Sequence, residues 1–432
     1  MRTREIISGN SKMQWWQEAR FGMFIHWGIY ALAARHEWVK NYEKMTDADY
    51  SRYFEHFEPD LFEPRQWAQT ARKAGMKYFV ITTKHHDGFC LWDTKYTDYK
   101  SVNTPAGKDL IAEVVTAFRA EGIKVGFYYS LLDWHHPHFT IDRNHPQLEM
   151  PELDAVNQQR DMKIYAEYMR NQVTELLSNY GKIDYMFFDY SYPEGKDGKG
   201  HKDWESEKLL QLVRELQPEI IINDRLDLMT NVGGWDFITP EQYKPAKWPE
   251  INGKRVFWET CQTFSGSWGY YRDETSWKSI RQLLILLIET VSKGGNLLLN
   301  VGPTARGNFD QRAVDRLNLM GKWLGLHKRA IYGCTQAPED LSCPENCLLT
   351  FKAETNRLYI HILEWPLEKL ILPNYRGKVA YAQLLHDASE IRFAQPRVWS
   401  VVPENFTPGD LVLSLPVIQP DVEIPVLELF LK

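Results

Sequence analysis

Short apolar runs alternate with longer amphipathic stretches over most of the chain. Eight of these runs are rich in β-branched and aromatic residues and finish in polar side chains, a pattern that predicts β-strands. They cover residues 21–28, 77–88, 123–134, 183–191, 219–226, 236–242, 256–262 and 296–303. Helical spacing of apolar positions separates several of them, at residues 63–75, 108–122, 162–181, 204–217 and 276–295. Strands that alternate with helices predict a parallel sheet built from β-α-β units.

The number of strands indicates the architecture. Eight strands within about 335 residues fit a (β/α)8 barrel better than an open sheet. The segments that follow Arg225 and Glu241 are too short or too rich in proline to hold a full helix. We therefore predict a distorted (β/α)8 TIM-like barrel over residues 1–335.

The pattern changes after residue 335. Residues 347–355, 357–365, 378–386 and 422–432 alternate apolar and polar positions, and Pro, Asn and Gly lie between them. Short alternating strands of this kind predict a small antiparallel C-terminal β-sandwich over residues 336–432.

Charge and hydropathy narrow the class of partner. The net charge of −6 and the lack of a Lys/Arg tract argue against a nucleic-acid partner. The longest apolar runs are much shorter than the roughly 18 to 20 residues that span a bilayer, so we expect no membrane insertion. The N-terminal stretch lacks the apolar core of a signal peptide, and the five cysteines form no C-x-x-C pair. Both features favour a cytoplasmic location, and the sequence leaves open whether the chain forms a homo-oligomer.

The aromatic content is unusually high. Aromatic residues make up 13% of the chain and include 16 Trp. Aromatic faces stack on the C–H patches of sugars, which suggests a carbohydrate ligand. Extra aromatic packing in the core explains the same composition equally well, so composition alone leaves both interpretations open.

Polar residues at the ends of the predicted strands indicate an active site. In a parallel barrel the active site lies at the carboxyl ends of the strands. One polar residue there is usually structural, but every predicted strand carries one. In strand order they are His26, His85 with His86, Tyr128 with Tyr129, Asp189, Arg225, Glu241, Glu259 and Asn300.

The residue types restrict the chemistry. His85 and His86 are neighbours on one predicted strand, so their side chains should point to opposite faces and would not easily share one metal ion. The sequence contains no phosphate-binding loop, dinucleotide fingerprint or G-x-S-x-G elbow. The remaining carboxylates, imidazoles and indoles suit glycoside cleavage by a pair of Asp or Glu residues. Asp189 follows an aromatic strand and fits a rigid nucleophile, whereas Asp184 at the other end is expected to be structural.

Several blocks of the sequence match a known family. The most specific are F-I-H-W-G at 24–28, K-H-H-D-G-F-C-L-W at 84–92 and L-L-L-N-V-G-P at 297–303. From about residue 12 to residue 335 the chain resembles the α-L-fucosidases of glycoside hydrolase family 29. The resemblance implies a retaining exo-hydrolase that removes terminal α-L-fucose from oligosaccharides or glycoconjugates. It also implies a covalent intermediate on Asp189 and no metal or organic cofactor.

The same resemblance implies roles for the other site residues. The positions that match residues holding the fucose hydroxyls, the ring face and the nucleophile are His26, Glu37, Trp38, His85, His86, Tyr128 and Arg225. Trp268 is expected to form a wall of the site. Glu241 matches the proton donor of several family members, and Glu259 is the rival acid/base.

Two further expectations concern neighbours of these residues. Lys84 and Asp87 are expected to form a structural ion pair. Tyr190 stands where Gly is frequent in the family, which should narrow the site.

Two other functions remain as alternatives. One is a glycan-binding protein whose catalytic site has decayed. The other is a metal-dependent barrel hydrolase that uses His26, His85, His135, His136 and His138.

Overall fold

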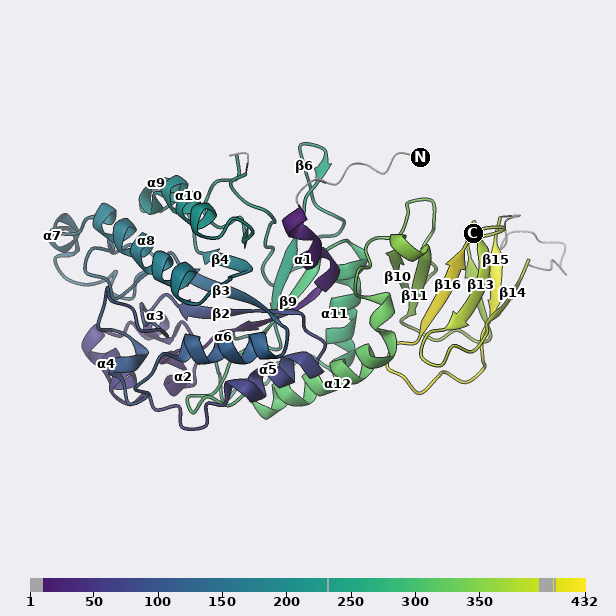
Figure 1. Ribbon diagram of the computed structural model, residues 1–432, viewed down its shortest axis with the longest axis horizontal. Coiled ribbons are helices and arrows are strands. Elements are labelled where there is room, and N and C mark those ends of the chain that lie inside the picture. The colour runs from purple at the N-terminus through teal and green to yellow at the C-terminus, as the bar shows by residue number, and fades with distance from the viewer. Residues whose placement is uncertain (1–10, 231–232, 396–406, 408) are drawn as a thin grey trace.

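The computed structural model describes residues 11–230, 233–395, 407 and 409–432. Two adjoining parts lie along the long axis of the molecule (Figure 1). A parallel sheet with helices around it forms the larger part, and antiparallel strands form the part that contains the C-terminus. The predicted fold class, a distorted barrel followed by an antiparallel sandwich, is confirmed.

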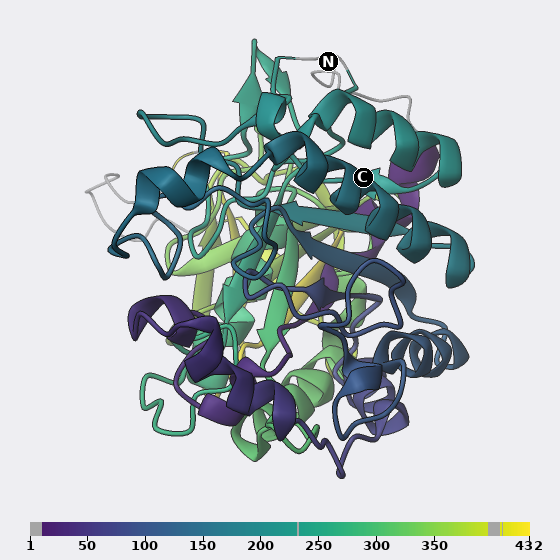
Figure 2. The same ribbon diagram turned by 90° about the vertical axis from the view of Figure 1, so that its left-hand side faces the viewer.

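Seven parallel strands form the central sheet, in the order β5-β4-β3-β2-β1-β9-β8. Their bounds are β1 Phe21–Ile25, β2 Tyr78–Lys84, β3 Lys124–Ser130, β4 Tyr185–Asp189, β5 Ile221–Ile222, β8 Glu259–Thr263 and β9 Asn296–Val301. All residues of β1, β2, β8 and β9 are buried, because helices cover the outer face and side chains fill the interior. Figure 2 shows the helices arranged around these central strands.

The sixth predicted strand, 236–242, is not a regular strand. Isolated parallel bridges join Phe237 to Asn223, Ile238 to Trp258 and Glu241 to Cys261. The segment therefore lies between β5 and β8 and closes the barrel without a continuous ladder. Pro240 contributes to the interruption, because it has no N–H to donate to a neighbouring strand. The prediction of a regular strand here is wrong, and the irregularity is the distortion of the barrel.

The five predicted helical stretches are confirmed. They correspond to α5 Pro64–Lys73, α6 Leu110–Ala120, α8 Met162–Asn179, α10 Ser206–Leu216 and α11 Ile280–Ser292. The long helix α12, Gln311–His327, was not predicted. The shorter helices are α1 Gln14–Ala19, α2 Tyr30–Ala33, α3 Val39–Tyr42, α4 Asp47–Glu55, α7 Leu153–Gln158 and α9 His201–Trp204. Four 3-10 turns lie at Ser11–Met13, Ser101–Asn103, Lys328–Ala330 and Ala353–Thr355, and β6 Glu250–Ile251 pairs with β7 Lys254–Arg255.

Local sequence signals explain where the helices of the barrel begin. Pro64 occupies the first turn of α5, where its missing N–H costs no hydrogen bond. The side chain of Asp109 accepts a hydrogen bond from the Ala112 amide at the start of α6. Ser279 and Gln282 form a capping box at the start of α11. These signals fix where the three helices begin.

The C-terminal part is a sandwich of two antiparallel sheets. One sheet has the order β10-β11-β16-β13 and the other has the order β12-β15-β14. The strands are β10 Cys347–Lys352, β11 Arg357–Ile362, β12 Lys369–Leu372, β13 Val379–Leu384, β14 Arg392–Ala394, β15 Leu411–Ser414 and β16 Val426–Leu431. Leu358 and Leu427 of the first sheet pack in one apolar cluster with Leu372 and Leu413 of the second. The three strands of the second sheet were not predicted.

The two parts share an extensive contact. The Trp323 indole donates to the Ile424 carbonyl at 3.1 Å, and Arg329 pairs with Glu428 at 2.7 Å. The apolar core of the barrel continues into Tyr359 and Val426 of the sandwich. The boundary between residues 335 and 336 stays a prediction.

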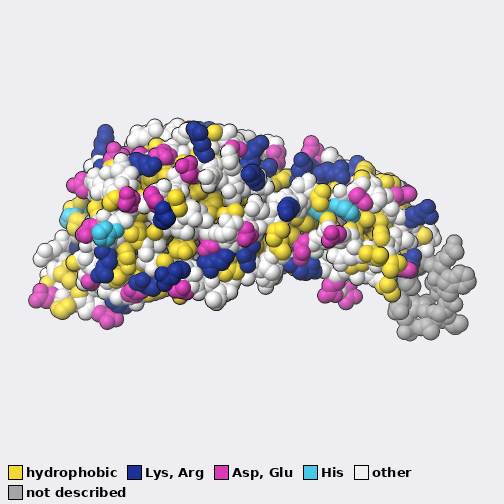
Figure 3. All heavy atoms as spheres, turned by 90° about the horizontal axis from the view of Figure 1, so that it is seen from below, with side chains coloured by type: hydrophobic (Ala, Val, Ile, Leu, Met, Phe, Trp, Pro, Cys, Tyr) yellow, Lys and Arg dark blue, Asp and Glu magenta, His cyan; other side chains and the backbone are white. Residues whose placement is uncertain are grey.

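The surface carries both signs of charge. Figure 3 shows basic and acidic side chains interspersed over one long face of the molecule. Within the described ranges, no helix combines the length and the apolar character that crossing a bilayer requires.

Candidate active site

A pocket of about 370 Å³ lies at the carboxyl ends of the barrel strands. Its position matches the predicted rim of polar residues. Its lining residues are Phe24, His26, Trp38, His85, His86, Tyr128, Phe187, Asp189, Tyr190, Glu241, Cys261 and Trp268.

Strand alternation decides which side chains reach this pocket. Phe187 and Asp189 are two residues apart on β4 and face the same side. Tyr128 lies opposite Phe187 in the register of β3 and β4, and its ring stacks on that of Phe187 at 5.7 Å. Tyr129 faces outward instead, where its hydroxyl donates to Gln172 Oε1 at 2.7 Å. The pocket therefore receives Tyr128 and not Tyr129.

Arg225 connects two carboxyl groups of the site. Its Nη1 lies 3.1 Å from Asp189 Oδ1, and its Nη2 lies 3.1 Å from Glu241 Oε2. The second oxygen of Asp189 accepts a hydrogen bond from the Tyr128 hydroxyl at 2.8 Å. The Asp189 side chain is 14% exposed and that of Glu241 is 41% exposed. One carboxylate is thus held rigidly inside the pocket, and the other lies at its mouth.

Burial and charge set the protonation of these groups. Burial raises the pKa of Asp189 to about 6, with Arg225 acting against the rise and Glu241 adding to it. Burial and the adjacent Asp189 raise the pKa of the Tyr128 phenol, so this hydroxyl keeps its proton and donates. Asp189 is therefore a carboxylate at neutral pH, stabilised by two donors.

Three imidazoles lie next to the carboxylates. Burial lowers the pKa of His26 to about 3 and lowers the pKa values of His85 and His86 as well, so all three rings are neutral. The rings of His85 and His86 are 4.0 Å apart and both line the pocket. The prediction that they point to opposite faces is wrong, because β2 ends at Lys84 and the chain turns there.

The turn after β2 explains the polar sequence around these histidines. Gly88 has a φ of +81°, and a Cβ there would lie 2.4 Å from Asp133 Oδ1, so only glycine fits. Asp87 accepts hydrogen bonds from the Tyr50 hydroxyl and the Phe89 amide, at 3.0 and 3.2 Å.

The ion pair beneath this turn is not the predicted one. Lys84 pairs with Asp133 at 2.9 Å, and both side chains are buried. The predicted pair of Lys84 with Asp87 is wrong, because Lys84 belongs to the strand and points under the turn, towards the segment that follows β3.

Glu37 supports a loop and does not line the pocket. Its Oε2 accepts hydrogen bonds from the amides of Trp268 and Gly269, at 3.1 and 2.7 Å. Trp268 thereby holds its place in the pocket wall, as predicted, and its ring lies 5.0 Å from that of His26. A contact between Glu37 and a sugar stays a prediction.

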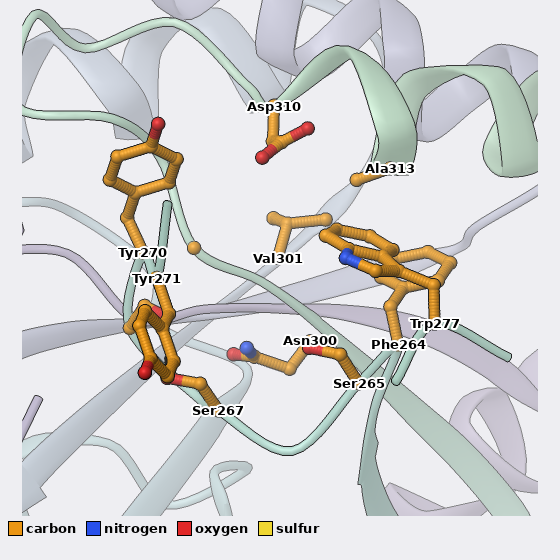
Figure 4. Close-up of a pocket in the computed structure, with 12 residues that line it drawn as sticks. Phe264, Ser265, Ser267, Tyr270, Tyr271, Trp277, Asn300, Val301, Asp310 and Ala313 are labelled. Carbon is orange, nitrogen blue, oxygen red and sulfur yellow. Dashed lines mark hydrogen bonds between the residues drawn. The ribbon is translucent and has the colours of Figure 1, made fainter. Parts of the chain in front are cut away.

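A second pocket lies on the far side of the Trp268 loop. It has a volume of about 340 Å³, and Figure 4 shows Ser267, Tyr270, Tyr271 and Asn300 among its walls. Asn300 faces this pocket and also contacts His26 of the first one. The loop and Asn300 therefore separate the two cavities.

Glu259 lies away from the pocket. It is the first residue of β8, at the amino end of the strand, and it is fully buried. The hydroxyls of Tyr78 and Tyr185 donate to its two oxygens. The expectation that Glu259 stands at the carboxyl rim with the other groups is wrong, because β8 begins at this residue.

The histidines of the metal-hydrolase alternative do not converge. His135 stacks on Tyr99 at 3.9 Å, and His136 packs against Tyr168 at 4.3 Å, outside the pocket that holds His26 and His85. Across the part of the chain that the structure describes, no group of three His, Cys, Asp or Glu side chains is arranged to hold a metal ion.

Some residues of the site were not predicted as such. Phe24 and Cys261 line the pocket, and Ser130 contacts His86 behind it. Phe24 follows from the same alternation that gives His26, two residues later. Ser130 ends an aromatic strand at the carboxyl rim, and that position was the available signal.

Glycoside hydrolases work with a pair of carboxyl groups, and this pocket holds two on one arginine, with imidazole and indole rings around them, at the carboxyl end of a barrel. The α-L-fucosidase family model matches residues 2–329. The chain belongs to the α-L-fucosidases, glycoside hydrolase family 29, and the predicted resemblance is confirmed.

Individual relatives agree with the family model. The tissue α-L-fucosidase of Mus musculus is 30% identical over 378 residues, covering 82% of this chain and 78% of that protein. The structure of α-L-fucosidase isoenzyme 1 from Paenibacillus thiaminolyticus is 43% identical, with a TM-score of 0.90 and coverage of 98% of this chain and 99% of that chain.

A further structure captures a reaction intermediate. This α-L-fucosidase from Bacteroides thetaiotaomicron is 27% identical, with a TM-score of 0.84 and coverage of 100% of this chain and 98% of that chain. It was solved as a trapped covalent intermediate with 2-fluoro-fucosyl fluoride, using a glutamate-to-glutamine mutant.

Proposed function

We propose that this chain is a retaining exo-α-L-fucosidase in which Asp189 is the nucleophile and Glu241 is the acid/base. The observation that carries the assignment is the contact of both carboxylates with Arg225 from positions of unequal exposure. Retaining glycosidases need one fixed, ionised carboxylate and a second one about 5 to 5.5 Å away that exchanges protons. Asp189 is the fixed, buried carboxylate, and Glu241, on the same arginine at the mouth of the pocket, is the carboxyl group placed to exchange protons.

The first chemical step forms the glycosyl-enzyme. An oxygen of Asp189 attacks the anomeric carbon as the bond to the leaving oxygen breaks, and Glu241 transfers its proton to that oxygen. Arg225 and Tyr128 hold both oxygens of Asp189 in place, so the nucleophile loses little freedom when it attacks. The leaving group departs on the side of Glu241, where the pocket is open.

The second step releases the sugar. Glu241, now a carboxylate, takes a proton from water while the water oxygen attacks the anomeric carbon and the bond to Asp189 breaks. Two displacements at the same carbon retain the α-configuration. The covalent intermediate of the Bacteroides relative supports this route.

The pocket supports terminal fucose as the substrate unit. His26, His85 and His86 supply polar contacts, and Trp38 and Trp268 supply aromatic faces for the C–H patches of the ring. The pocket is less open than the hollows beside it, which favours one terminal sugar and suits an exo-enzyme acting on fucosylated oligosaccharides or glycoconjugates. Two hollows that are more open than this pocket flank the site. Arg143 lines one and Tyr243 lines the other, and both offer room for the leaving group.

The test is azide rescue with an aryl α-L-fucoside. Asp189→Ala lacks the nucleophile, so azide should attack the substrate directly and give β-fucosyl azide. Glu241→Ala still forms the glycosyl-enzyme, so azide should intercept it and give α-fucosyl azide. Glu259→Ala is the matched control and should give no azide product. The assignment would be overturned if α-fucosyl azide formed with the Glu259 variant, or if it formed with neither the Glu241 variant nor the Glu259 variant.

The wild-type protein tests the alternative function. Hydrolysis that releases α-fucose first, seen by NMR, is the expected result. Sugar binding with no turnover would favour the glycan-binding protein with a decayed site. The cytoplasmic location stays a prediction, and the sequence leaves the formation of a homo-oligomer open.

A further inference from the structure

Two histidines of the pocket share one kind of support. Nδ1 of His26 lies 2.7 Å from Oδ1 of Asn300, which belongs to the neighbouring strand β9. Nδ1 of His86 lies 2.6 Å from Oγ of Ser130, the last residue of the neighbouring strand β3. All four side chains are buried. Because an imidazole nitrogen either donates or accepts, the chemistry of each partner decides where the ring hydrogen lies.

Asn300 fixes the hydrogen of His26. The Asn300 amide nitrogen donates to the Trp268 carbonyl at 2.6 Å, and a carbonyl oxygen can only accept. The amide nitrogen therefore faces the Trp268 loop, and the amide oxygen faces His26. That oxygen also only accepts, so the contact requires a hydrogen on Nδ1 of His26.

Ser130 fixes the hydrogen of His86 by a separate route. The Ser130 hydroxyl has one hydrogen, and it donates this hydrogen to the Leu132 carbonyl at 2.8 Å. The hydroxyl oxygen is then an acceptor towards His86. The short contact between the two side chains requires a hydrogen on Nδ1 of His86.

A neutral imidazole carries a single ring hydrogen. Both rings are neutral, as their lowered pKa values indicate, so Nε2 of each ring is left with a free lone pair. Within the described part of the chain, neither Nε2 has a hydrogen-bond partner, and both rings line the pocket.

On the basis of the fucosidase site proposed above, we infer that Asn300 and Ser130 are positioning residues that make Nε2 of His26 and of His86 hydrogen-bond acceptors for the sugar. Two hydroxyl groups of the bound fucose then have to donate. A fluorine or a methoxy group in place of such a hydroxyl cannot donate, so the site discriminates against both. His85 has no such support, because its Nδ1 is buried without a partner in the described residues. His85 is therefore the residue in the same protein with which His26 and His86 can be compared.

The direct test reads the ring hydrogens by NMR. Protein with ¹⁵N-labelled histidine gives correlation patterns that separate a protonated ring nitrogen from a bare one, and His26→Asn and His86→Asn assign the two signals. The expected pattern at neutral pH is a hydrogen on Nδ1 and a bare Nε2 in both rings. A hydrogen on Nε2, or a doubly protonated ring, at either position of the wild-type protein would overturn the inference. This result does not depend on turnover, so it is separate from the fate of the proposed function.

Variants of the supporting residue test its role. Ser130→Ala should change the His86 pattern towards a hydrogen on Nε2 and leave His26 unchanged, whereas Ser130→Thr keeps the hydroxyl and should restore the wild-type pattern. An unchanged His86 signal in Ser130→Ala would show that Ser130 does not set the tautomer. The wild-type spectrum decides the tautomers even if a variant fails to fold.

Ligand analogues test the consequence for binding. The catalytically impaired Glu241→Gln protein is titrated by calorimetry with methyl α-L-fucoside and with analogues that carry hydrogen or fluorine in place of one hydroxyl. At two of the hydroxyl positions, hydrogen and fluorine should weaken binding to the same extent, by about tenfold or more. Fluorine that binds clearly better than hydrogen at every position would contradict the inference. No binding of the parent fucoside would instead count against the proposed function.

Discussion

Asp189 and Glu241 bind the two Nη atoms of the same guanidinium group, each at 3.1 Å from Arg225. This arrangement holds both carboxyl groups beside one positive charge and couples their ionisation. Arg225 stabilises the ionised form of Asp189, whereas the charge of Glu241 disfavours it. The arginine therefore acts on the nucleophile both by position and by charge.

The first prediction concerns the pH dependence of catalysis. Asp189 has to be ionised to attack, and its pKa is about 6, so kcat/KM should fall as the pH drops below about 6. Arg225→Gln removes the charge that lowers this pKa, so the acid limb should move to higher pH and the rate should fall at least 100-fold. The measurement is kcat/KM against pH with an aryl α-L-fucoside.

Arg143→Gln is the control for this experiment. Arg143 borders the flanking hollow together with Arg225, but it binds the backbone carbonyls of Tyr192 and Glu194. Its loss should leave the acid limb in place. An acid limb that does not move in Arg225→Gln would show that Arg225 does not set the ionisation of the nucleophile.

The second prediction separates Glu241 from Glu259. Glu241→Gln cannot protonate a leaving group, so kcat/KM should fall by about 10² to 10⁴ for a fucosyl disaccharide. A nitrophenyl leaving group needs little protonation, so its kcat/KM should fall by less than about tenfold. Glu259→Gln should change both substrates by the same factor, because Glu259 lies outside the pocket. Equal losses for both substrates in Glu241→Gln would remove it as the acid.

The third prediction concerns Tyr190, directly after the nucleophile. Tyr190 has a φ of +81°, and its ring packs at 5.4 Å from Trp38 and 5.1 Å from His86. The ring also borders the flanking hollow that Arg143 lines, so it separates this hollow from the active-site pocket. Tyr190→Gly relieves the backbone strain but removes this wall, and KM for an aryl fucoside should rise about tenfold with a smaller change in kcat. Tyr190→Phe keeps the ring and should behave like the wild type. Unchanged KM in the glycine variant would rule out this separating role.

The polar ends of the predicted strands indicated the rim, and Asp189, at the end of β4, lines the pocket. The choice of Tyr128 over Tyr129 rested on the family resemblance, because the strand pattern placed both at the rim. The strand pattern did not predict where a strand begins or ends. β2 stops at Lys84 and β8 starts at Glu259, so the expected directions of His85, His86 and Glu259 were wrong.

Contacts between residues far apart in the sequence could not be predicted either. Asp133 lies 49 residues after Lys84, and only the folded chain brings the two charges together. The hydrogen bonds of Asn300 and Ser130 are of the same kind, since they join neighbouring strands that the sequence places far apart. The polar ends of strands could be predicted, but not which of them bind substrate and which hold a substrate-binding residue in place.

The last prediction concerns stability and uses Glu259. Burial raises its pKa to about 7, while an unfolded glutamate titrates near 4.5. Between pH 4.5 and pH 7, Glu259 is therefore protonated in the folded chain and ionised in the unfolded chain. The contribution of this residue to stability is complete below pH 4.5 and disappears as the pH rises through 7. The difference amounts to about 3 kcal/mol. The glutamine side chain of the Glu259→Gln protein is neutral at every pH, so this variant does not lose that stability as the pH rises. The melting temperature of the Glu259→Gln protein, relative to that of the wild type, should rise between pH 5 and pH 8. The other titrating groups contribute equally in both proteins, so their effects cancel in this difference. A difference that stays constant over this range would mean that Glu259 is ionised in the folded protein at all these pH values.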